Sequence, residues 1–516
     1  MLESRVHKSI KNVSFGLLTQ VVQMLLGFVS RTVFIRYLAV EYLGVNALFS
    51  SILTLLSLAE LGITSAILYA LYKPLAENNE EQIAVLMNFF RKVYLKIALA
   101  VAILGLLIFP FLQSIVKNPP KALADDLTLI YFLFLFNTVA SYFFYYKLSL
   151  FHADQKSYLI SGRNIIISII QTALQIISLL FFQNFIAYLI IQILCQLLGN
   201  IYLSQLVNKH YPFLNHFPNS ELNPTIKSEI YSNLKSTAIT KVGGLLVNNS
   251  TNLVLNYFSG LIAIGLLSNY VLLIGLITGI IAQIFSSLTS SIAHVNVKES
   301  IEKKRQIFFI INFTNFWIYG IAAVGVLLFI NDFITLWVGQ KFVLPFSTVI
   351  VIALNFYMVG MQNAVWTYKS TLGLFKYGRW LILLTAFLNI VFSFVLGYWF
   401  GLTGILLSLA LARLLTNSWY DPYIVFKKAL QLSAARYFSR YLGYLLFLCL
   451  LSLVMFYANA SIIEINSGVL LLKVIVYLVV SNILLYLVFR KSDEIQFIVH
   501  VITHFYDVIR SKINRN

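Results

Sequence analysis

The sequence predicts an all-α polytopic membrane protein of about fourteen transmembrane helices. This fold class follows from an apolar composition, from long apolar runs along the whole chain, and from a one-sided distribution of positive charge. Of the 516 residues, 59% are hydrophobic and only 11% are charged, and the mean hydropathy is +0.84. Soluble domains carry roughly 25% charged residues because their surface faces water. Lipid is therefore the expected surroundings of most of this chain.

The apolar runs are long enough to cross a bilayer. A helix rises ~1.5 Å per residue, so about 20 apolar residues span a hydrocarbon core of ~30 Å. The expected spans, in chain order, are 14–37, 44–71, 88–112, 126–147, 158–182, 185–207, 236–258, 263–293, 307–330, 346–369, 378–400, 402–426, 438–459 and 467–489.

Positive charge orients these spans, because Lys and Arg accumulate in cytoplasmic loops. With the N-terminus inside, the inner loops contain Lys73, Arg91, Lys92, Lys96, Lys147, Lys156, Lys209, Lys227, Lys235, Lys298, Lys303, Lys304, Arg305, Lys369, Lys376, Arg379, Lys427, Lys428, Arg436 and Arg440. The outer loops contain little beyond Arg36, Lys117, Lys121 and Lys341. The bias never reverses, so both termini are expected in the cytoplasm. The net charge of +18 is spread over short loops, which excludes a basic nucleic-acid-binding domain.

The longest polar interruption contains three prolines and divides the chain near its middle. The expected parts are an N-terminal six-helix bundle (1–207), a cytoplasmic linker (208–235), a C-terminal six-helix bundle (236–430), two additional transmembrane helices (431–490) and a cytoplasmic amphipathic tail (491–516). The tail has an apolar face typical of a helix on the inner leaflet. That face consists of Ile495, Ile498, Val499, Ile502, Phe505 and Ile509.

The two bundles resemble each other at a nearly constant shift. Gly44 corresponds to Gly265 at a shift of 221, and Lys147 corresponds to Lys369 at a shift of 222. An offset of six spans preserves orientation, so the repeats are predicted to be parallel. Parallel repeats are typical of transporters whose substrate passes between two halves.

Several charged residues lie inside the expected spans, where a charge costs at least a few kcal/mol without water or a partner. Arg31, Arg413, Lys241 and Arg163 form a sparse ladder of cations across the membrane, and Glu60 is the one acid in that ladder. The cations predict a wet, positive cavity for an anionic headgroup. Snorkelling to an interface is the other interpretation of Arg31 and Lys241. Glu60 is open to two roles, an ion-paired structural acid or a site that binds a proton or a cation.

Amide side chains accompany these cations at helical spacing. Gln20 and Gln23 share a face with Arg31 in the first span, and Asn248 and Asn252 share a face with Lys241 in the seventh. Because the two spans correspond under the repeat, both stripes are expected to line a central cleft and to meet sugar hydroxyls. Hydrogen bonding between neighbouring helices is the alternative role of the asparagines.

Several ordered motifs resemble those of a known family. They are Ser30–Leu38 (SRTVFIRYL), Tyr42–Gly44 (YLG), Leu58–Gly62 (LAELG), Ala153–Tyr158 (ADQKSY), Leu336–Gly339 (LWVG), Gly401–Ile405 (GLTGI) and Trp419–Pro422 (WYDP). In their order and position they are similar to the Wzx-type polysaccharide repeat-unit flippases of the multidrug/oligosaccharidyl-lipid/polysaccharide (MOP) exporter superfamily. The likeness covers about residues 10 to 430. Arg31 and Glu60 stand within these motifs, whereas Arg413 and Lys241 do not.

The resemblance implies a V-shaped, MATE-like pair of bundles that works by alternating access. The implied cargo is an undecaprenyl-diphosphate-linked oligosaccharide, moved to the outer leaflet of a bacterial plasma membrane during glycan assembly. The expected partners are this polyprenyl-diphosphate-linked glycan, membrane lipids, a polysaccharide polymerase and glycosyltransferases, and no nucleic acid. No cofactor is expected beyond coupling to H⁺ or Na⁺.

Other functions stay open or are disfavoured on chemical grounds. A peptidoglycan-precursor lipid flippase would share the basic cavity, whereas a multidrug or cation antiporter of the same superfamily predicts an acidic or aromatic one. A polysaccharide polymerase would need a large external loop, and no catalytic constellation occurs in the exposed segments. Cys195 and Cys449 both lie in apolar runs, which favours neither a disulfide nor a metal site.

Overall fold

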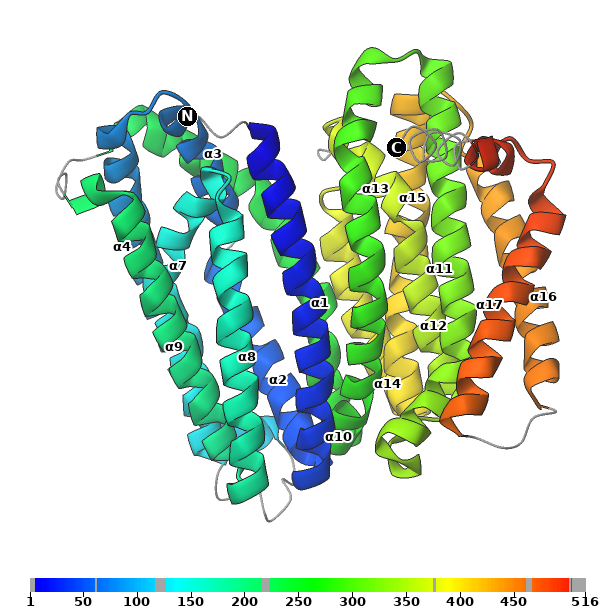
Figure 1. Cartoon of the computed structure of the whole chain (residues 1–516), viewed down its shortest axis with the longest axis horizontal. Coiled ribbons are helices and arrows are strands. Elements are labelled where there is room, and N and C mark those ends of the chain that lie inside the picture. Colours follow the sequence, from blue (N-terminus) through cyan, green and yellow to red (C-terminus); the bar gives the residue numbers. More distant parts are fainter. Residues whose placement is uncertain are drawn as a thin grey trace, which may run out of the picture. The chain divides into compact units, whose positions relative to one another are not determined.

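The computed structural model describes residues 5–60, 63–116, 127–215, 222–374, 377–460, 466–500 and 503, and these residues form helices and connecting turns without a β-strand (Figure 1). The α-helices are α1 (Arg5–Tyr37), α2 (Val40–Leu56), α3 (Ile63–Ala76), α4 (Glu80–Ile108), α5 (Leu112–Ile115), α7 (Leu127–Ala153), α8 (Ser157–Phe182), α9 (Phe185–His210), α10 (Pro224–Lys298), α11 (Ile301–Val338), α12 (Phe346–Met361), α13 (Asn363–Thr371), α14 (Leu381–Leu415), α15 (Asn417–Val425), α16 (Ala435–Ala460) and α17 (Ser467–Phe489). Short 3₁₀ segments are η1 (Ser57–Glu60), η2 (Phe109–Phe111), η3 (Pro212–Asn215) and η4 (Gln340–Phe342), and η6 (Phe426–Leu430) is a π-helix.

Within these residues, eleven helical segments are long and apolar enough to cross a membrane. Two of them fold back at a glycine, α10 at Gly260 (φ +72°) and α14 at Gly401 (φ +53°), where the left-handed backbone favours a residue without a Cβ. Helices α2 and α3 are also apolar, but each is too short to cross the membrane alone, so neither is among the eleven. The pattern agrees with the prediction of about fourteen helices, and the chain is a multi-pass membrane protein.

The second expected span, 44–71, is not one helix. Helix α2 ends at Leu56, η1 follows, and α3 begins at Ile63. The Ser57 hydroxyl donates to the Leu53 carbonyl (2.9 Å), a local bond that competes with regular helix continuation. Hydropathy alone could not reveal this break, because the residues on both sides are apolar.

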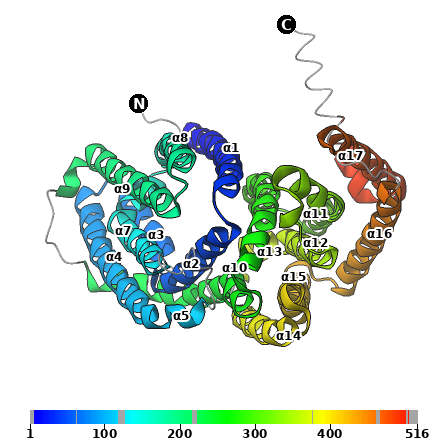
Figure 2. The ribbon, with the colours of Figure 1, turned by 90° about the horizontal axis from the view of Figure 1, so that it is seen from below.

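The chain divides into two compact units, Met1–Ser268 and Asn269–Asn516. In the first unit, α7 packs against α4 and α9, while α1 packs along α8 (Figure 2). In the second unit, α11 packs against α12, α16 and α17. Aromatic rings fill the centre of the second unit, where Phe316 stacks on Tyr444 with ring centroids 4.1 Å apart.

The first arm of α10 belongs to the first compact unit, although the sequence assigned residues from 236 onward to the second bundle. Its hydrogen bonds to Ser51 on α2 and to the Ile115 carbonyl agree with this placement. The predicted C-terminal bundle begins at residue 236, whereas the second compact unit begins at Asn269. The two divisions of the chain are different, and the predicted bundle boundaries stay a prediction.

Two glycines bring the α2 backbone against the second arm of α10. A Cβ on Gly44 would lie 2.1 Å from the Leu261 carbonyl oxygen, and a Cβ on Gly265 would lie 2.3 Å from the Val40 carbonyl oxygen. The shift of 221 maps Val40 onto Leu261 and Gly44 onto Gly265. The two contacts are thus each other's counterparts under the repeat, as expected where a two-fold pseudosymmetry axis passes through a helix crossing. We call these four residues the glycine crossing.

Only the start of the predicted amphipathic tail lies within the described residues. Glu494 pairs with Arg440 on α16, and Ile495 is buried in the apolar core of the second unit. Val499 is exposed. The remaining predicted apolar positions, Ile502, Phe505 and Ile509, lie outside the described residues.

Substituting alanine for Gly44 should destabilise the protein. The new methyl group cannot fit beside a backbone carbonyl, and overpacking of this kind costs about 1–3 kcal/mol. Gly27→Ala is the matched control, since a Cβ at this position of α1 meets nothing within 4 Å. Thermal loss of helical circular dichroism in detergent should occur at a lower temperature for Gly44→Ala than for Gly27→Ala. Equal midpoints would contradict the close approach.

Candidate functional site

Arg31 lies on α1 and reaches the second arm of α10. Its Nη1 donates to the Ser268 hydroxyl oxygen (2.7 Å), and the Ser268 hydroxyl donates to the Gly265 carbonyl (2.7 Å). The side chain is half-buried. This chain of bonds ends on one of the glycines of the glycine crossing, so the guanidinium is held beside that crossing.

Asn252 makes the repeat-related contact from the first arm of α10. Its side-chain amide donates to the hydroxyl of Ser51 on α2 (2.9 Å). Residue 252 corresponds to residue 31 at the shift of 221. The first helix of each repeat therefore bonds to the second helix of the other repeat, one through a guanidinium and one through an amide.

The other residues of the two predicted stripes have different surroundings. Gln20, Gln23, Lys241 and Asn248 have exposed side chains. Asn256, one turn beyond Asn252, is buried and donates to the Ile115 carbonyl. The first unit thus holds Arg31 beside the glycine crossing and Asn252 against Ser51 on α2, whereas Gln20, Gln23, Lys241 and Asn248 lie on exposed helix faces.

Arg413 belongs to the second unit, on the second arm of α14, where it is half-buried. None of the acids within the described ranges lies within ion-pair distance of it. A guanidinium in an apolar span without an acidic partner needs water or an anion to offset its desolvation.

Glu60 ends η1, at the break between α2 and α3. Its carboxylate accepts hydrogen bonds from the hydroxyls of Thr64 (3.0 Å) and Tyr94 (3.4 Å), which are themselves 3.1 Å apart. Tyr142 is close enough to interact with Glu60 as well. In the described part of the chain no cation lies within 4 Å of this acid, and hydroxyls surround it instead. Such a carboxylate is chemically able to hold a proton or a small cation.

The sequence did not predict the buried ion pair between α13 and α15. Lys369 Nζ lies 2.6 Å from Asp421 Oδ1, and the Asp421 side chain is only 5% exposed. Both residues stand in motifs that the sequence makes visible, Tyr368–Lys369 of the repeat and the WYDP run. Their pairing was missed because 52 residues separate them along the chain.

The ADQKSY motif forms a polar clamp between the α7–α8 turn and the end of α9. The Tyr211 hydroxyl donates to Asp154 Oδ2 (2.6 Å), and Lys156 Nζ lies 2.7 Å from the same oxygen. The Lys156 ammonium also sits over the Tyr211 ring. Burial raises the pKa of Tyr211 above its ordinary value, so the phenol stays a neutral donor at physiological pH. This motif therefore has a structural role here.

The sequence matches the family model of polysaccharide biosynthesis proteins over residues 9–289, just over half of the chain. The chain belongs to this family. None of the curated proteins compared with it matches. The predicted family resemblance is confirmed.

Several solved structures of membrane transporters have a similar fold. The lipid II flippase MurJ in an inward closed conformation matches with a TM-score of 0.64 at 13% identity, over 93% of this chain and 99% of that chain. A mutant of the Vibrio cholerae MATE transporter VcmN matches with a TM-score of 0.55 at 14% identity, over 82% and 96%. An inward-facing multidrug resistance MATE transporter matches with a TM-score of 0.52 at 14% identity, over 76% and 92%. The predicted MATE-like helical fold is confirmed.

Breaking the buried ion pair should strongly destabilise the second unit. Lys369→Met leaves the Asp421 carboxylate buried and uncompensated, which costs about 3–5 kcal/mol. Lys147→Met is the matched control, because Lys147 is the repeat counterpart and pairs with no acid of the described chain. Thermal unfolding in detergent should separate the two variants, and Lys369→Met/Asp421→Leu should recover part of the loss. Equal stability of the two single variants would contradict the structural role of the pair.

Proposed function

We propose that this protein is a flippase. Its cargo would be an undecaprenyl-diphosphate-linked oligosaccharide repeat unit, moved from the inner to the outer leaflet of a bacterial plasma membrane for capsule, exopolysaccharide or cell-wall glycan assembly. Membership of the polysaccharide biosynthesis family and the fold of MOP transporters support this class of function. The proposed orientation has both termini in the cytoplasm, as the loop charges predict.

The observation that carries the proposal is Arg413, a half-buried guanidinium in an apolar span with no acidic partner among the described residues. A diphosphate carries the complementary charge and would offset the desolvation of this side chain. Arg31 would provide a second cation and Lys241 a third. Gln20, Gln23, Asn248 and Asn252 would bind sugar hydroxyls.

In the proposed transport cycle, the bonds that Arg31 and Asn252 make to Ser268 and Ser51 would open and close. The bond from Arg31 to Ser268 involves a charged donor and contributes about 1.5–3 kcal/mol, whereas the neutral bond from Asn252 to Ser51 contributes about 0.5–1.5 kcal/mol. Such bonds are weak enough to break during alternating access. An arriving diphosphate would compete with Ser268 for the Arg31 guanidinium, which couples cargo binding to opening.

Glu60 is the proposed coupling site, for H⁺ or Na⁺. Its position at the break between α2 and α3 supports this role, because non-helical backbone at membrane depth occurs where it lines a cavity or a site. The hydroxyls of Thr64 and Tyr94 would supply further oxygen ligands to a cation.

The peptidoglycan-precursor lipid is the second candidate cargo, supported by the fold shared with the lipid II flippase MurJ. A cationic site does not distinguish these two lipids, because both carry a diphosphate. The identity of the lipid that accumulates when the gene is deleted separates the two candidates.

Arg31→Gln and Arg413→Gln should each reduce transport by about 10- to 100-fold, the range expected when a charge-assisted contact of roughly 1.5–3 kcal/mol is lost. The measurement is accumulation of lipid-linked glycan on the inner leaflet of cells that express only the variant. Arg31→Lys should retain more transport than Arg31→Gln. Arg36→Gln, an exposed residue at the end of α1, is the control and should transport normally. Unimpaired transport by both glutamine variants would overturn the proposed cationic site.

A further inference from the structure

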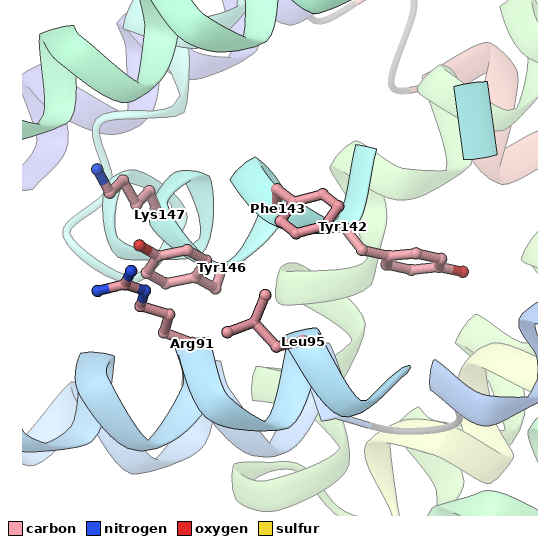
Figure 3. A pocket seen from close by; sticks show the side chains of 6 residues that line it. All are labelled: Arg91, Leu95, Tyr142, Phe143, Tyr146 and Lys147. Carbon is pink, nitrogen blue, oxygen red and sulfur yellow. The ribbon is translucent and has the colours of Figure 1, made fainter. Parts of the chain in front are cut away.

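A second cationic site lies in the first unit, away from the glycine crossing. It is a pocket of about 240 Å³ between α4 and α7, on the side that loop charges assign to the cytoplasm (Figure 3). Its lining consists of Arg91, Leu95, Tyr142, Phe143, Tyr146 and Lys147. None of these residues belongs to the predicted transport cavity.

One side of the pocket is built for an anion. The Arg91 guanidinium, the Lys147 ammonium and the Tyr146 hydroxyl point in the same direction (Figure 3). Together they can donate hydrogen bonds to one anion, because a guanidinium has five N–H donors, an ammonium three and a phenol one O–H donor. Arg91 is near enough to Lys147 for their like charges to repel. No acidic residue lines the pocket, and neither cation pairs with an acid of the described chain.

Comparison of the two repeats shows that this charge is specific to the first. Lys147 corresponds to Lys369, whose charge is neutralised by Asp421 at 2.6 Å. At the same shift of 222, Asp421 corresponds to Gly199, so the first repeat has no acid at this position. Arg91 corresponds to Phe313, which is neutral. The first repeat therefore lacks the neutralising carboxylate and carries an additional cation.

An exposed apolar strip continues from the cations along both helices. On α4, Leu95 and Leu99 follow Arg91 at four-residue intervals and are 40% and 61% exposed. On α7, Phe143 and Phe136 precede Lys147 by four and eleven residues and are 49% and 55% exposed. These spacings keep each set on one helix face. Eleven residues of helix extend about 16 Å, roughly the thickness of one leaflet of the hydrocarbon core.

We propose that this pocket binds the phosphate of a membrane lipid. Arg91, Lys147 and the Tyr146 hydroxyl hold the phosphate oxygens, and the lipid chain lies along the apolar strip of α4 and α7. Basic pockets between helices at the cytoplasmic surface take phosphorylated headgroups in this manner. Both an anionic phospholipid of the leaflet and a polyprenyl diphosphate carry this chemistry. A free phosphate would leave the apolar strip without a partner, so the lipid-borne group fits better.

Lipid binding to the purified full-length protein tests the proposal without any transport step. The probes are phosphatidylglycerol, undecaprenyl diphosphate and inorganic diphosphate, each titrated into protein in detergent and measured by native mass spectrometry. Arg91→Gln/Lys147→Gln should weaken binding of at least one lipid about tenfold relative to the wild type. Inorganic diphosphate should bind far more weakly than that lipid. The occupant is the lipid whose affinity for the protein falls more in Arg91→Gln/Lys147→Gln than in the wild type.

The matched control is Lys73→Gln/Lys209→Gln, which removes two exposed charges from the same side of the same unit. It should bind lipid as the wild type does, and equal loss in this control would overturn the proposal in favour of nonspecific surface charge. Unchanged binding by the Arg91/Lys147 variant, or equally tight binding of inorganic diphosphate, would also overturn it. Arg91→Lys retains the charge and should bind nearly normally, which covers the case in which the double variant fails to fold. Failure of glycan transport alone would leave these binding results unchanged.

Discussion

The close backbone approach at the glycine crossing is the constraint on which much of this structure depends. In lipid, helices gain no hydrophobic free energy from association, because the acyl chains are as apolar as the side chains. Contact between helices must come from van der Waals packing and hydrogen bonds, and both improve as the backbones approach. Gly44 and Gly265 allow that approach, since a Cβ at either would enter a carbonyl oxygen of the facing helix.

The polar side chains around this crossing follow from the same constraint. Arg31 donates to Ser268, which bonds the Gly265 carbonyl at the crossing, and Asn252 donates to Ser51 further along α2. Two residues related by the repeat contact corresponding helices through serines that differ in position by one helical turn, although one of the two residues is charged and the other is neutral. Duplication thus explains where the polar side chains lie, and divergence explains why only one of them is a cation. Under the proposed function, that difference would give an anionic headgroup a preferred partner in Arg31.

Much of the fold follows from the sequence because lipid imposes simple rules: apolar length sets the spans, loop charge sets their orientation, and helix spacing sets which residues share a face. The rules do not determine what a face contacts. Gln20 and Asn252 both lie on predicted stripes, yet one is exposed and the other bonds α2. The pairing of Lys369 with Asp421 was missed because it joins residues that are distant in the chain. The break at η1 was missed because the residues on both sides of it are apolar, so hydropathy does not mark it.

The repeats differ most in how they treat equivalent charges. A lysine neutralised within the protein, such as Lys369, stabilises a helix contact and attracts little from outside. A lysine beside an arginine, such as Lys147 beside Arg91, leaves the pocket between α4 and α7 positively charged. Exposed apolar side chains lie next to this pocket. Equivalent positions of the two repeats thus differ in net charge, because Asp421 has no acidic counterpart beside Lys147. This difference is the physical basis on which an anion would favour the first repeat over the second.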